Sequence, residues 1–150
     1  MTLNDISVQK WISNDSFKFE DLKGRVVAIH AFQMLCPGCI MHGIPQAKKL
    51  HDFFDTNKVA VLGLHTVFEH HEAMQEVSLT AFMHEFRVFF PVGIDQPTES
   101  NIPKTMETFS LRGTPTWIIF DKTGALAFHA FGQVEDSVIS SIITQLCLDQ

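Results

Sequence analysis

Two cysteines separated by two residues, Cys36 and Cys39, follow an apolar run at 26–32 and precede a segment with apolar residues at helical spacing. Cysteines at this spacing can form a small disulfide, and a helix N-terminus stabilises the thiolate released when that disulfide opens. Pro37 suits the first helical position, where proline loses no hydrogen bond. The pattern predicts a redox pair at the start of a helix, with Cys36 as the N-cap and attacking nucleophile and Cys39 as the more buried, resolving thiol.

Half of a zinc site and a structural disulfide are the two alternative interpretations of this pair. A tetrahedral zinc site needs two further ligands, and the only other cysteine, Cys147, stands alone near the C-terminus. Cys147 shares a helical face with Ile139 and Ile143, which favours a buried, inert thiol over a third redox partner. The segment 69–72 contains two histidines and two glutamates, but neighbouring residues rarely converge on one ion, and a polar helix start explains them equally well.

A second motif, Gly113-Thr114-Pro115, lies far from the cysteines and just before the apolar run 117–120. Together with Cys36 and Cys39, it resembles the thioredoxin superfamily, in which a cis-proline opening a strand faces the cysteine pair. The resemblance implies that Pro115 is cis and part of the catalytic site. It also implies that Gly113 and Thr114 bind substrate, with the Thr114 backbone pairing with an incoming peptide strand. The alternative is an ordinary trans proline at the start of a strand.

The order of apolar segments predicts an α/β protein with strands alternating with helices. We expect a mostly parallel sheet covered on both faces, with one antiparallel edge from the final hairpin. Ser78 is available to cap the second long helix. The expected elements are a strand at 26–32, a helix at 40–54, a strand at 59–65, a helix around 79–86, an extended piece at 89–94, a short helix at 105–109, strands at 117–120 and 125–131, and a helix at 137–148.

The long separation between Cys39 and Pro115, and the lead-in at 19–27, resemble the TlpA-like or redoxin (AhpC/TSA-like) branch of the superfamily. This resemblance implies a thioredoxin fold over one domain, residues 1–150. Its central mixed β-sheet would be flanked by helices, with an extra αβ insertion between the cysteine-bearing helix and the cis-proline strand. It also implies a thiol-disulfide oxidoreductase that exchanges disulfides with protein substrates through its Cys-Pro-Gly-Cys site.

Four positions depart from the family pattern. His30 stands where thioredoxins have a buried carboxylate, Leu35 where many have tryptophan, and His42 where TlpA-like proteins often have glutamate. Pro45, the helix proline, comes one residue later than usual. His30 is a possible proton relay for the thiols, or simply a packed core side chain; His42 is open to the same two interpretations, catalytic or merely helix surface.

Two other functions are open to a chain of this kind. One is a peroxiredoxin-like thiol peroxidase, although that family has proline and threonine where this chain has Ile29 and Gln33. The other is a copper-binding metallochaperone, which in this fold uses a wider cysteine spacing and a distant histidine.

Composition limits the remaining possibilities. The chain has 150 residues, 45% of them hydrophobic, which is enough for one domain with a substantial core. Its net charge is −6 and it has no basic run, which argues against a nucleic-acid partner. The polar start at 1–6 does not resemble a signal peptide, and no apolar run is long enough to span a bilayer. We therefore expect a cytoplasmic monomer or weak dimer without cofactor, metal or membrane contact, whose partners are protein thiols and disulfides and an unidentified reductant or oxidant.

Overall fold

A six-stranded sheet organises the described part of the chain, with the strand order β1-β4-β3-β2-β5-β6. The computed structural model describes residues 1–12 and 17–149. The strands are β1 (Val8–Trp11), β2 (Val26–Phe32), β3 (Val59–His65), β4 (Val92–Asp95), β5 (Thr116–Phe120) and β6 (Leu126–Phe131). This mixed sheet confirms the expected thioredoxin-like fold class.

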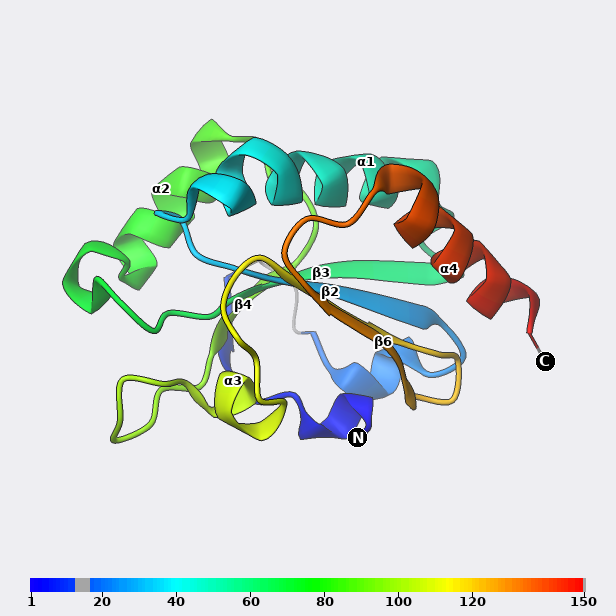
Figure 1. Cartoon of the computed structure of the whole chain (residues 1–150), viewed down its shortest axis with the longest axis horizontal. Coiled ribbons are helices and arrows are strands. Elements are labelled where there is room, and N and C mark those ends of the chain that lie inside the picture. Colours follow the sequence, from blue (N-terminus) through cyan, green and yellow to red (C-terminus); the bar gives the residue numbers. More distant parts are fainter. Residues whose placement is uncertain (13–16, 150) are drawn as a thin grey trace.

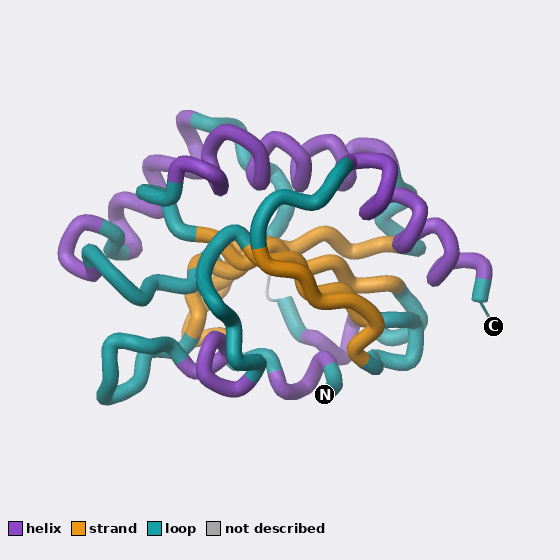
Figure 2. Tube along the Cα trace, viewed as in Figure 1, coloured by secondary structure: helices purple, strands orange, loops and turns teal. Residues whose placement is uncertain are grey.

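Helices cover the two faces of the sheet unequally. Figure 1 shows α1, α2 and α4 on one face, with the short α3 and the N-terminal turns on the other. The α-helices are α1 (Ile44–Phe53), α2 (Glu76–Glu85), α3 (Lys104–Thr108) and α4 (Asp136–Leu148). The shorter helical turns among the described residues are η1 (Leu3–Asp5), η2 (Phe19–Leu22), η3 (Cys39–Gly43) and η4 (His71–Ala73), of which η3 is a π-helical turn. Figure 2 shows the strands enclosed between these two layers.

The sheet is less parallel than the sequence predicts. Strands β2, β3 and β4 are parallel, and β5 and β6 are added as an antiparallel hairpin beside β2. The expectation of a single antiparallel edge was wrong, because β1 pairs antiparallel with β4 at the opposite edge. This strand has only four residues, none of them fully buried, so it lacks the apolar run that marks a central strand.

Strand β2 divides the core between the two faces. All seven of its residues are buried, and because neighbouring side chains point to opposite faces, Val27, Ile29 and Ala31 join the core beneath α3. Val26, Ala28 and Phe32 join the core beneath α1 and α4. His30 shares this second face by the same alternation, so a polar ring is placed under the helix that follows the cysteines.

Two predicted boundaries were wrong. Helix α2 begins at Glu76 with Gln75 as its N-cap, so Ser78 lies within the first turn instead of capping it. An acidic residue at the first position favours this earlier start, because the positive end of the helix dipole stabilises it. The extended piece expected at 89–94 forms strand only from Val92, and the Phe89 side chain is exposed. Within the described residues, no helix is long and apolar enough to cross a membrane.

Candidate active site

The two cysteines occupy different environments at the start of the same helix. Cys36 is half-buried, Cys39 has no exposed surface, and both are free thiols. The Ile40 N–H donates to the Cys36 carbonyl at 3.1 Å, and the Cys39 N–H donates to the Cys36 Sγ at 3.3 Å. The Cys36 side chain therefore satisfies a free backbone N–H of the first helical turn, as an N-cap does.

Burial makes the Cys39 thiol a weak acid. Desolvation is the main cause that raises its pKa to about 12, and the hydrogen bond with Cys36 adds to it. At neutral pH Cys39 is protonated, so it can act as a nucleophile only when another group or solvent takes its proton.

The Thr114–Pro115 element lies against the cysteine pair. The peptide bond between these residues is cis, as the sequence indicates. The Cys36 thiol donates to the Thr114 carbonyl at 3.4 Å, and the Pro115 Cδ lies 3.4 Å from the position that a Cβ would take at Gly38, between the two cysteines. Gly113 is buried, and its carbonyl accepts a hydrogen bond from the Thr116 hydroxyl at 2.6 Å. The structure thus brings Cys36, Cys39 and the proline motif together.

The loop before Cys36 is held by buried polar side chains whose role the sequence does not reveal. Gln33 donates through Nε2 to the Thr114 hydroxyl at 3.4 Å and accepts from the Phe68 N–H at 3.1 Å. The backbone carbonyl of Gln33 accepts a hydrogen bond from the Cys36 N–H at 3.2 Å. His65, the last residue of β3, accepts the Met34 N–H on Nε2 at 3.2 Å. Only the fold brings these partners near one another, so no local pattern could have identified them.

A π-turn joins Cys39 to α1. The Ile44 N–H donates to the Cys39 carbonyl five residues back, instead of the four of an α-helix. Such a turn takes up one extra residue, which accounts for the late position of Pro45. Gly43 is required at its place: a Cβ there would lie 2.3 Å from the Nε2 of His30. The imidazole ring occupies the space that a side chain at position 43 would need.

His30 itself is fully buried and lacks any hydrogen-bond partner for either ring nitrogen within the described part of the chain. The centroid of its ring lies 4.9 Å from the ring centroid of Trp117, its neighbour on β5, and 5.9 Å from the ring centroid of Phe32. Desolvation lowers the pKa of His30 to about 3, which keeps the imidazole neutral. The residue predicted as a possible proton relay therefore lies beneath η3 and α1, the helical segment that begins at the cysteine pair. It is a buried polar group without a hydrogen-bond partner among the described residues.

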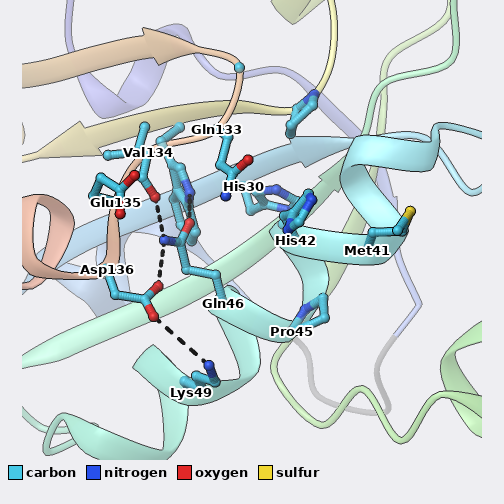
Figure 3. A pocket seen from close by; sticks show the side chains of 14 residues that line it. His30, Met41, His42, Pro45, Gln46, Lys49, Gln133, Val134, Glu135 and Asp136 are labelled. Atoms are coloured by element: carbon cyan, nitrogen blue, oxygen red, sulfur yellow. Dashed lines mark hydrogen bonds and ion pairs between the residues drawn. The ribbon is translucent and has the colours of Figure 1, made fainter.

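A second buried network lies beside His30. The Trp117 indole N–H donates to the Gln46 Oε1 at 2.8 Å, and the Gln46 Nε2 donates to the Val134 carbonyl at 2.6 Å and to the Asp136 Oδ1 at 2.8 Å. Figure 3 shows these bonds joining α1 to the start of α4. Gln46 thus fixes α1 against the β6–α4 connection.

Other predicted residues lie outside this centre. His42 is exposed beside the cavity that His30 lines, and Leu35 is exposed next to Cys36. Cys147 is half-buried near the end of α4, where burial raises the pKa of its thiol. Among the residues that the structure describes, no group of three histidine, cysteine, aspartate or glutamate side chains is placed to hold a metal ion.

Comparison with solved structures identifies the family. The chain is 49% identical to the thioredoxin-like superfamily protein SPOA0173, with a TM-score of 0.95 over 100% of this chain and 98% of the other. It is 44% identical to a thiol-disulfide isomerase from Corynebacterium glutamicum, with a TM-score of 0.95 over 97% and 95% of the two chains. The chain belongs to the thioredoxin-like thiol-disulfide oxidoreductases.

More distant relatives share the fold of this oxidoreductase. A thioredoxin-like protein solved in its oxidised form is 19% identical, with a TM-score of 0.77 over 99% of this chain and 98% of the other. No protein-family model matches the chain, and no curated protein matches it closely enough to support relatedness.

Proposed function

We propose that this oxidoreductase exchanges disulfides with protein substrates, with Cys36 as the nucleophile and Cys39 as the resolving thiol. The observation that carries the proposal is the placement of the half-buried Cys36 sulfur between the Cys39 N–H, at 3.3 Å, and the Thr114 carbonyl, at 3.4 Å. The N–H stabilises a thiolate on Cys36. In this proposal the backbone of Thr114, beside Pro115, pairs with an extended substrate strand.

The proposed reaction has two steps. The Cys36 thiolate attacks a substrate disulfide, a bond forms between Cys36 and one substrate sulfur, and the other sulfur leaves and takes up a proton. Cys39 then loses its proton and attacks the Cys36 sulfur. The Cys36–Cys39 disulfide forms, and the second substrate sulfur leaves as a thiol. The substrate is reduced and the protein oxidised, so a thiol reductant must restore the pair.

The buried Cys39 also favours isomerisation. Burial raises the pKa of its thiol and so keeps its thiolate scarce, which gives a second thiol of the substrate time to attack the mixed disulfide first. That attack rearranges the substrate disulfide and releases Cys36 reduced, with no net oxidation. The name of the relative from Corynebacterium glutamicum, a thiol-disulfide isomerase, agrees with this outcome.

Single-cysteine variants test the proposal on a protein with scrambled disulfides. Cys36→Ser should abolish both reduction and isomerisation, because no attacking thiolate remains. Cys39→Ser should keep the attack but accumulate a covalent mixed disulfide, which a non-reducing gel detects. Cys147→Ser is the matched control, and its activity should equal that of the wild type. A trapped complex on Cys36→Ser instead of Cys39→Ser would reverse the assignment of the two thiols.

A further inference from the structure

A second cavity lies at the carboxyl ends of β3 and β4, outside the site described above. The two strands are parallel, so the connections that follow them leave from the same end of the sheet, as Figure 1 shows. The cavity has a volume of about 310 Å³, which is at the lower end of the range for pockets that hold small molecules. Its lining does not include Cys36, Cys39, Thr114 or Pro115.

Two connections form the walls of this cavity. One runs from β3 through η4 to the start of α2 and contributes His71 and Met74. The other runs from β4 to α3 and contributes Thr98 and Pro103. The His71 Nε2–H donates to the Asn101 carbonyl at 3.1 Å. A direct hydrogen bond therefore joins the two walls.

The wall that follows β4 is braced by its own side chains. The Thr98 hydroxyl donates to the Ile102 carbonyl at 2.6 Å and accepts from the Ser100 N–H at 3.1 Å. The Ser100 hydroxyl in turn accepts from the Ile102 N–H at 3.0 Å. Pro97 and Pro103 restrict the backbone at the two ends of this segment. A wall held in this way is preformed, so a ligand would order few additional groups when it binds.

His65 brings a free hydrogen-bond donor to this cavity. Its side chain is only 1% exposed, and its Nε2 accepts the Met34 N–H. Burial lowers the pKa of His65 to about 4, so the ring is neutral and carries its one proton on Nδ1. No described residue bonds to Nδ1. Unlike the two nitrogens of His30, however, this Nδ1 keeps contact with solvent, and His65 is part of the cavity lining. The Nδ1–H therefore opens into the cavity as a buried donor.

Charges around the cavity restrict the ligand that suits this donor. The described lining contains the acidic residues Asp95 and Glu76 but no lysine or arginine. Glu76 pairs with Lys10 at 2.7 Å. Burial raises the pKa of Asp95 to about 6, so this carboxyl is mainly ionised at pH 7. An anionic ligand would therefore be repelled, and an ammonium group has no acceptor to offer the His65 Nδ1–H.

We propose that this cavity binds a small neutral molecule with an amide oxygen and an apolar body. The oxygen accepts the His65 Nδ1–H, and the apolar body packs on Val67, Met74 and Ile94 in the lining. The side-chain amide of Gln75 at the exposed rim accepts from the N–H of the bound amide. This site goes beyond the proposed function, because it uses none of the residues that carry disulfide exchange.

Binding in this cavity reaches the redox centre through one side chain. The His65 ring lies between the cavity and the Met34 N–H, which belongs to the loop before Cys36. A ligand that accepts the Nδ1–H polarises the ring and strengthens the bond from Met34 to Nε2. A ligand that binds only the folded protein also stabilises it. The amide of Met34 is therefore a reporter of binding.

An NMR titration with three matched probes tests the site and the class of ligand. Benzamide, benzoate and benzylammonium share one ring and differ in charge and in hydrogen-bonding groups. With the full reduced chain at pH 7, benzamide should shift the backbone amide signals of Met34, Met74 and Ile94 with a Kd of about 1 mM. Benzoate and benzylammonium should bind at least about 10-fold more weakly.

Two results of this titration would overturn the proposal. Benzoate or benzylammonium binding as tightly as benzamide would contradict the class of ligand. No shift at benzamide concentrations of about 20 mM, as expected of a cavity that holds only water, or shifts confined to other parts of the chain, would contradict the site. Neither result depends on any redox activity, so the proposed function is tested separately.

Two variants and a matched control locate the binding. His65→Leu removes the donor and should weaken benzamide binding about 10-fold. Gln75→Trp places a bulky ring at the rim and should abolish binding, with disulfide exchange unchanged. Val77→Trp should alter neither, because Val77 is 77% exposed on α2 and is not part of the lining. Undiminished benzamide binding in Gln75→Trp, or in folded His65→Leu, would overturn the proposal. If His65→Leu does not fold, Gln75→Trp decides alone.

Discussion

Two fully buried histidines flank the redox motif, and their surroundings differ. His65 supports the loop before Cys36 by accepting the Met34 N–H, whereas His30 lies under the turn after Cys39 with neither nitrogen bonded among the described residues. A buried polar group with a partner contributes to stability, and one without a partner costs stability. His65 therefore supports the architecture of the loop, whereas His30 gains no hydrogen bond in return for its burial.

Acidification should have the largest effect, because both histidines must stay neutral to remain buried. Burial lowers the pKa of His30 to about 3 and that of His65 to about 4, from 6.5. Their contribution to stability is therefore complete above pH 6.5 and is lost as the pH falls towards those lower values. Between pH 7 and pH 4.5 the two residues together should remove about 5 kcal/mol from the free energy of unfolding.

Asp95 opposes part of this acid effect. Burial raises the pKa of its carboxyl to about 6, so the folded state takes up this proton more readily than the unfolded chain and gains about 2 kcal/mol over the same interval. The expected net loss is about 3 kcal/mol, measured by urea unfolding at the two pH values. Stability that stayed constant or rose on acidification would contradict the neutral, buried state of the histidines.

Gly43→Ala should give the next largest effect, because the new Cβ would lie 2.3 Å from the His30 Nε2. Overpacking of this kind costs about 1–3 kcal/mol, measured by urea unfolding at pH 7. In a His30→Val background the same change should cost much less, since the ring that it meets is gone. Gly38→Ala is the control, because its Cβ would meet Pro115 at 3.4 Å, an ordinary contact. Equal costs in both backgrounds would show that the His30 ring is not the reason why position 43 requires glycine.

His65→Leu should destabilise the protein by about 1–2 kcal/mol, because it leaves the Met34 N–H without its acceptor. Chemical denaturation at pH 7 measures the loss. His65→Gln can offer an amide oxygen to the same N–H and should recover part of the stability. If His65→Leu were as stable as the wild type, His65 would have no structural role in this loop.

His30→Leu should have the smallest effect on stability, within about 0.5 kcal/mol of the wild type at pH 7, measured by urea unfolding. A leucine of similar volume fills the same space, and removing two buried nitrogens without partners offsets the loss of ring packing. A loss above about 1 kcal/mol would show that the imidazole makes stabilising contacts in the folded protein.

Local sequence signals predicted much of the redox centre. The spacing of Cys36 and Cys39, the helix start at Pro37 and the Thr114–Pro115 motif each depend on a few neighbouring residues, and the structure places them together. The two central parallel strands were also predicted, because continuous apolar runs mark buried strands. Edge strand β1 was missed because it is short and partly exposed.

The supporting polar network could not be predicted in the same way. Gln33, Gln46 and His65 have bonding partners 31 to 90 residues away along the chain. The need for glycine at position 43 of the π-turn likewise comes from His30, which belongs to another element and occupies the space beside Gly43. No periodicity within one segment contains that information.

The sequence by itself determined which atoms can do the chemistry: two thiols at a helix start, a proline motif far along the chain and a histidine in a core strand. Only the tertiary structure decided how deeply those atoms are buried and which hydrogen bonds they make. Burial under the helix raises the pKa of Cys39 to about 12, and both nitrogens of His30 are buried without a partner among the described residues. The physical reason is that desolvation and hydrogen-bond satisfaction depend on every element packed around a group, whereas spacing along the chain reports only its nearest neighbours.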